Sequence, residues 1–242
     1  MEEESQKTAS LIDSLDHSDK RTIRGAVDSL IAIAARSQEL QETLNRLLVD
    51  PSRKNRWSIA YILAHLPNPS RSCLKVLLDT LGSEDPDIRW AAGLLLVRLG
   101  KCDEGMVTLL LDLLKTGNPI QRRMAAYCLR DMNLKDSASL QAVLASLQDP
   151  DPLVRVAAVT SLKPRPEIGK NGLHSLLHLF LADPDHRVRH IAALALAELG
   201  APTDEIRKAL KDASRSEDPQ LKKAAQAALD LLQKKGAAPP AK

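Results

Sequence analysis

Residues 151–162 read DPLVRVAAVTSL, and five other segments of the chain repeat this pattern. The basic residue that follows the Asp-Pro pair serves as an anchor, and successive anchors are 33 or 34 residues apart. A fixed period of this length is the sequence signature of a helical repeat array. The anchors are Arg56, Arg89, Arg122, Arg155, Arg189 and Lys222, and a weaker seventh copy without the Asp-Pro pair contains Arg24.

Each anchored segment has the residues that begin a helix. In four copies Asp or Asn stands four residues before the anchor and is followed by Pro, which is typical of an N-cap and the first helical position. Asp185 keeps the cap in the sixth copy, where His186 replaces Pro. The four Pro-containing pairs are Asp85-Pro86, Asn118-Pro119, Asp151-Pro152 and Asp218-Pro219.

Apolar or small residues then follow at positions −1, +3, +7 and +10 from the anchor, which form one stripe at helical spacing. A second amphipathic stretch precedes each cap, such as residues 74–81, 106–114 and 140–147. Each unit is therefore predicted to be helix A, a tight turn and helix B, where helix B contains the anchor. One pair cannot bury its own apolar face, so stacking is required.

The sequence predicts an all-α fold, a right-handed α-solenoid of about seven helix pairs over residues 7–235. Residues 1–6 and 236–242 show no apolar periodicity of their own and are expected to be disordered. Polar side chains are expected on the outer faces of the terminal units.

The recurring D-P-x-x-R-x-A-A-x-x-L pattern resembles HEAT repeats, in particular the short bacterial type found in phycobilisome lyases. The resemblance covers about residues 7 to 235. It implies a curved superhelix whose B helices line the concave side and whose usual role is scaffolding or partner binding.

Composition limits the alternatives. Hydrophobic residues make up 44% of the chain but aromatic residues only 2%, and the net charge is +3 over 242 residues. The first ten residues lack the features of a secretory signal and no run of 18 apolar residues occurs, so we expect a cytoplasmic protein without membrane insertion. Three widely spaced cysteines, Cys73, Cys102 and Cys128, favour neither disulfides nor a zinc site. We find no catalytic motif and expect no cofactor.

Positions that vary between copies on the solvent side are candidates for function. A helical wheel places +1, +5 and +8 opposite the core stripe. Both Trp and both Tyr of the chain occupy positions +1 and +5 of copies two to four. Trp, Tyr and Arg are enriched at binding hot spots. The predicted groove, which Lys163 also borders, consists of Trp57, Tyr61, Trp90, Arg98, Arg123, Tyr127 and Arg130.

The leading hypothesis is a monomeric, non-catalytic scaffold that binds a protein partner in this groove. In the competing interpretation, the rings only fill gaps between B helices. A second hypothesis is a lyase-like enzyme or lyase subunit that handles a tetrapyrrole. A third is nucleic-acid binding, similar to HEAT-like DNA glycosylases, although Tyr61 and Leu94 stand where a catalytic Asp is sought. The metal-binding His-Glu dipeptides of deoxyhypusine hydroxylases are absent.

Two other residue sets have structural interpretations. The anchor arginines are expected to form an Asp-Arg ladder between neighbouring copies, as pairs on the surface. Four histidines of the sixth copy form two i, i+4 pairs, a spacing that suits a metal, but they occupy different faces and we expect no metal site. They are His174, His178, His186 and His190.

Overall fold

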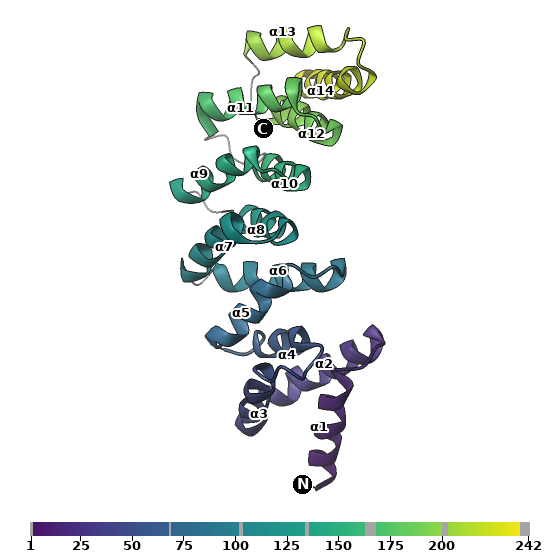
Figure 1. The fold of residues 1–242 in the computed structure, drawn as a ribbon, viewed down its shortest axis with the longest axis vertical. Helices are drawn as coiled ribbons and strands as arrows, with labels where there is room; N and C mark the ends of the chain where they lie inside the picture. Colours follow the sequence, from purple (N-terminus) through teal and green to yellow (C-terminus); the bar gives the residue numbers. More distant parts are fainter. Residues whose placement is uncertain are drawn as a thin grey trace. The chain divides into compact units, whose positions relative to one another are not determined.

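The computed structural model describes residues 2–67, 69–101, 104–133, 136–162, 168–199 and 203–237. These residues form fourteen α-helices, one short 3-10 helix and no strand (Figure 1). All seven anchors lie in even-numbered helices, as the repeat pattern predicts. The all-α fold is confirmed, whereas the right-handed superhelix stays a prediction.

The chain divides into two compact units, Met1–Met106 and Val107–Lys242, which are described separately. The first contains α1 (Glu2–Ser14), α2 (Lys20–Ala34), α3 (Gln38–Leu48), α4 (Arg56–Leu63), α5 (Arg71–Thr80) and α6 (Pro86–Gly100). Helix α7 (Glu104–Thr116) contains the boundary. The second contains α8 (Pro119–Asp131), α9 (Ser137–Ala145), η1 (Ser146–Gln148), α10 (Pro152–Leu162), α11 (Gly169–Ala182), α12 (His186–Glu198), α13 (Asp204–Ala213) and α14 (Pro219–Ala237).

Within the second unit the B helices form one layer, in which α8 packs on α10, α10 on α12 and α12 on α14. Figure 1 shows α9 and α11 to the left of this layer and α13 above α14, and each of these helices packs against a B helix. In the first unit α2 packs on α4 and α4 on α6. No helix among the described residues has the length and apolar character needed to cross a membrane.

The predicted caps are present. Asp85, Asp151 and Asp218 each accept hydrogen bonds from backbone N–H groups in the first turn of their helices. Asn118 and Gln121 form a reciprocal capping box. These bonds satisfy donors that have no partner within the helix.

The core stripe is confirmed where it is most regular. Position +3 is buried in all seven copies, and the five later copies all have Ala there. The leucines at +7 are fully buried in copies three to six, with Leu96 and Leu162 as examples. Small side chains at +3 let helices approach closely, and leucines fill the remaining space.

The second copy departs from the pattern because two more residues separate its Asp-Pro pair from the anchor. Its helix α4 begins only at Arg56, and the Asn55 side chain makes no capping bond. The preceding turn instead binds the end of α1, where Arg53 Nη1 lies 2.8 Å from the Asp16 carboxylate. Lys20 at the start of α2 forms ion pairs with Asp85 and Asp87 at the start of α6.

The expected terminal disorder is not what the structure shows at the N-terminus, where residues 2–6 belong to α1. Acidic side chains such as Glu3 and Glu4 favour the positive end of a helix, and Thr8 donates a hydrogen bond to the Glu4 carbonyl oxygen. At the other end α14 continues to Ala237, and residues 238–242 lie outside the described residues.

Candidate protein-binding surface

Positions +1 and +5 of the B helices face solvent within each unit, and we call these positions the +1/+5 face of that unit. None of the fourteen residues at these positions is buried, whereas position +3 is buried in all seven copies. The residues at +1 are Gly25, Trp57, Trp90, Arg123, Val156, His190 and Lys223, and those at +5 are Ser29, Tyr61, Leu94, Tyr127, Thr160, Leu194 and Ala227.

The expectation that +8 shares this face is wrong for several copies. Ala64, Val97 and Ala197 at +8 are buried, whereas Arg130 is half-buried and Asp230 exposed. A B helix has a neighbour on its flank as well as helix A behind it, so the solvent-facing sector is narrower than half of the helix. Position +4 shows the same effect: it is small or apolar and buried in copies two to six but is exposed Asp28 and Gln226 in the terminal copies.

In the first unit, α6 carries the most exposed apolar part of this face. Trp90 is 40% exposed and Leu94, one turn later, is 67% exposed. Leu94 was aligned in the +5 column but was not among the predicted site residues, because sequence alone gave no measure of its exposure. The pair gives α6 an apolar strip that faces solvent.

Helix α4, which packs against α6, carries Trp57 and Tyr61 at the corresponding positions, both half-buried. The Trp57 Nε1–H donates a long hydrogen bond of 3.4 Å to the Asn55 side-chain oxygen. The Tyr61 ring lies 4.7 Å from the His65 ring, centroid to centroid. Both contacts fix the rings locally and leave part of each ring accessible.

Arg98 is exposed but has a partner within the fold. Its Nη2 donates a 2.7 Å hydrogen bond to the carbonyl oxygen of Ala64, just after the end of α4. A carbonyl at a helix C-terminus has no intrahelical donor, and a nearby cation is favourable there. The structure therefore assigns Arg98 a capping contact beside the aromatic strip.

In the second unit, α8 carries the other three predicted residues, Arg123, Tyr127 and Arg130, all half-buried. The Arg130 guanidinium carbon lies 5.0 Å from the Tyr127 ring centroid, which is within cation–π range. Arg130 Nε also pairs with the Asp131 carboxylate at 2.7 Å. The seven predicted residues thus fall into two groups, four in the first unit and three in the second; Lys163 lies outside the described residues.

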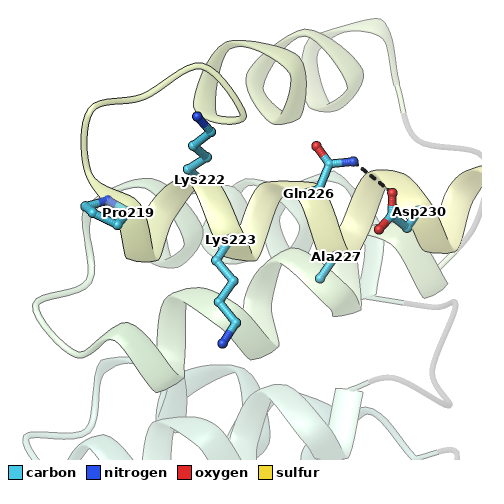
Figure 2. A pocket seen from close by; sticks show the side chains of 6 residues that line it. All are labelled: Pro219, Lys222, Lys223, Gln226, Ala227 and Asp230. Carbon is cyan, nitrogen blue, oxygen red and sulfur yellow. Dashed lines mark hydrogen bonds between the residues drawn. The ribbon is translucent and has the colours of Figure 1, made fainter.

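The face ends on α14 in a shallow, open hollow of about 460 Å³, shown in Figure 2. Sequence reasoning did not find it as a site, although it placed Lys223 and Ala227 in the two columns. Gln226 donates a 2.8 Å hydrogen bond to Asp230 at its border. The lining residues are Pro219, Lys222, Lys223, Gln226, Ala227 and Asp230.

The anchor arginines form the expected ladder in the second unit, but its middle pair is not on the surface. Arg122 pairs with Asp149, Arg155 with Asp183 and Arg189 with Asp218. Burial raises the pKa of Asp149, but hydrogen bonds from Arg122 and from the Asp151 backbone outweigh it and leave the pKa below 3.8. These ion pairs give the anchor arginine a structural role, which explains why it recurs in successive copies.

Reactive or metal-binding groups do not gather in the described residues. No set of three His, Cys, Asp or Glu side chains there is placed to hold a metal ion. His174, His178 and His186 are exposed and His190 is half-buried. Burial raises the pKa of the Cys73 and Cys128 thiols to about 12, so neither is a thiolate at neutral pH. Cys102 lies outside the described residues.

Comparison with known proteins identifies the repeat. A family model described as HEAT repeats matches residues 40–130 and 107–197. No curated protein sequence matches the chain.

Similar solved structures include YibA of E. coli, at 18% identity and a TM-score of 0.48, where the match covers 93% of this chain and 92% of that one. A designed armadillo repeat protein in complex with the peptide (KR)4 has 17% identity and a TM-score of 0.47, with 92% and 98% covered. Human deoxyhypusine hydroxylase has 15% identity and a TM-score of 0.44, with 95% and 96% covered. At these identities the likeness concerns the fold alone.

Proposed function

Because the chain belongs to the HEAT-repeat family, we propose that it is a non-catalytic scaffold that binds a protein segment on its +1/+5 face. The observation that carries this proposal is the exposed pair Trp90 and Leu94 on α6. In the same helix Ala92 and Leu96 are buried, whereas 40% of Trp90 and 67% of Leu94 are exposed to solvent.

Burial of the exposed apolar surface of Trp90 and Leu94 by a partner is favourable, at about 25 cal/mol per Å² removed from water. Trp is also the residue type most enriched at binding hot spots, where a partner excludes water from the ring. Trp57 and Tyr61 on α4 extend the same chemistry to the neighbouring helix. Arg123, Tyr127 and Arg130 supply the corresponding aromatic and cationic groups in the second unit.

The test is a co-purification from the source cell's lysate that compares the wild type with a Trp90→Ala/Leu94→Ala variant. The matched control is Val49→Ala, which removes another exposed apolar side chain of the first unit away from the +1/+5 face. All three proteins are first checked for equal melting temperatures. Bound proteins, nucleic acids and chromophores are then identified.

Retention of one protein by the wild type and by Val49→Ala, but not by the double variant, supports the proposal. If all three proteins retain the same partner equally, α6 does not belong to the binding site. That result would favour the interpretation in which the rings only fill gaps between B helices. Loss of a tetrapyrrole or a nucleic acid instead of a protein supports the second or the third hypothesis, respectively.

A further inference from the structure

The +1/+5 face of the second unit carries basic side chains that the face of the first unit lacks. It carries Arg123 on α8, His190 on α12 and Lys223 on α14, while α10 contributes the uncharged Val156 and Thr160. His186, one turn before His190, is exposed on the same side of α12. The face therefore presents basic groups on three of its four B helices.

None of the ion pairs found among the described residues of the second unit involves Arg123, His190 or Lys223. Each ion pair found among the described residues of the second unit uses another cation: Arg122, Arg130, Arg155, Arg187 or Arg189. Asp230, which lines the same hollow as Lys223, accepts a hydrogen bond from Gln226 (Figure 2). Arg123, His190 and Lys223 are thus available to an external carboxylate.

The hollow on α14 shows that the end of this face is open to solvent. Pro219, Lys223, Ala227 and Asp230 line it together, at −3, +1, +5 and +8 from the anchor. Figure 2 shows the Lys222 and Lys223 side chains pointing away from each other across the helix. Lys223 is thus the lysine that belongs to the +1 column.

We propose that the second unit binds an extended acidic segment of the partner protein, with carboxylates beside Arg123, His190 and Lys223. This inference rests on the proposed function and names the chemistry of the partner. Tyr127 and Leu194 lie at +5 beside these cations and offer apolar surface to the side chains between the carboxylates.

The helix spacing sets the register of such a segment. Packed helices lie about 8 to 10 Å apart. A segment in the polyproline II conformation advances about 3.1 Å per residue with three residues per turn, so one layer corresponds to about three residues, and side chains three or six residues apart point to the same side. Arg123 and His190 are two layers apart, and Lys223 is one layer further. The segment is therefore expected to carry acidic residues at relative positions 1, 7 and 10.

A peptide fits this face better than a nucleic acid does. The carboxylates of Asp151, Asp185 and Asp218 stand at the starts of the same B helices, four residues before the anchors. A nucleic-acid backbone carries negative charge continuously along its length, so its phosphates would be repelled by these carboxylates. A peptide can place its few carboxylates beside Arg123, His190 and Lys223 and carry uncharged side chains elsewhere.

The probe is a fluorescein-labelled peptide with Glu at positions 1, 7 and 10, compared by fluorescence anisotropy with an isomer that carries the three Glu residues consecutively. Binding is measured to the full chain in 0.15 M salt. Lys223→Glu and Arg123→Glu are each expected to weaken binding of the spaced peptide about tenfold, which corresponds to about 1.4 kcal/mol. Lys208→Glu, an equal charge change on the exposed face of α13, is the matched control and is expected to leave the affinity unchanged.

Absence of binding, equal affinity for the two isomers, or an equal loss in Lys208→Glu and Lys223→Glu would overturn the inference. Tighter binding of a single-stranded oligonucleotide of the same charge would also overturn it, in favour of a phosphate ligand. The proposed function is tested separately from this inference. If the chain does not bind acidic peptides but still captures a partner through Trp90 and Leu94, the scaffold role stands and only the acidic segment is ruled out.

Discussion

Arg155 and Asp183 form a bidentate ion pair in which Nε and Nη2 of the arginine each lie 2.8 Å from a carboxylate oxygen. Only 8% of Arg155 and 5% of Asp183 is exposed. Arg155 Nη1 also donates to the carbonyl oxygens of Asp149 and Pro150, and Asp183 accepts from the Asp185 backbone. One arginine thus joins the turn of its own copy to the turn of the next.

Replacing Asp183 by Ala is expected to destabilise the protein by about 3 to 5 kcal/mol, because it leaves the Arg155 charge buried without its partner. Chemical denaturation measures this change in the free energy of unfolding. The control is Arg187→Ala, which breaks a more exposed pair with Asp185 and is expected to cost no more than about 1 kcal/mol. Equal effects of the two variants would show that the buried pair is not a principal contact between copies.

Two leucines of α6 separate folding from binding. Leu96 is fully buried and Leu94 is mostly exposed. Leu96→Ala is expected to cost about 2 to 5 kcal/mol through lost burial and a cavity, whereas Leu94→Ala is expected to change stability by less than about 0.5 kcal/mol. Thermal and denaturant unfolding test both, and a large loss of stability in Leu94→Ala would mean that this side chain packs rather than binds.

The small side chains at +3 are expected to resist enlargement. Ala192 is completely buried between packed helices, so Ala192→Leu is expected to overpack the core and cost about 1 to 3 kcal/mol. The comparison is Ala227→Leu at +5 of α14, where the side chain borders an open hollow. Circular dichroism melting curves distinguish them, and a stable Ala192→Leu variant would argue against close packing at +3.

Stability is expected to fall in acid. The pKa of Asp185 is about 2, mainly because of a hydrogen bond from Arg187, and the pKa of Asp149 also lies below 3.8 in the folded protein. A depressed carboxyl pKa contributes stability that is complete above the unfolded value and is lost as the pH falls through the folded value. The melting temperature is therefore expected to decrease between about pH 4 and pH 2.

The Asp149→Asn variant controls for this pH dependence. It starts less stable, because Arg122 loses its carboxylate, and its melting temperature is expected to decline less over the same pH interval. A wild-type melting temperature that stays constant from pH 5 to pH 2 would contradict the contribution of these carboxylates.

Features that recur from copy to copy could be predicted from sequence, because repetition separates the residues that fold each unit from those that vary. Buried Ala at +3 and the caps at Asp85, Asp151 and Asp218 belong to this group. The ladder of anchor arginines and aspartates was also predicted, but the burial of Arg155 was not. Residue spacing predicts which side of a helix a side chain lies on, but it does not predict whether a neighbouring element covers that side chain.

Features that depend on one copy escaped prediction. The pairing of Lys20 with Asp85 and Asp87 joins residues more than 60 positions apart, and the ion pairs found in the described parts of the other copies do not repeat it. The division near Met106 is invisible in the sequence because the period continues through it. On the candidate face, the columns were predicted but the exposure of Leu94 and the hollow beside Lys223 required the structure.

The most direct test of the scaffold proposal places a photo-crosslinking amino acid at position 94 in the source cell, with position 49 as the exposed control in the same unit. We expect a discrete protein adduct at position 94 that is absent at position 49 and disappears when Trp90→Ala is added. Adducts of equal yield at the two positions, or an adduct at position 94 that is insensitive to Trp90→Ala, would contradict the assignment of the +1/+5 face as the binding surface.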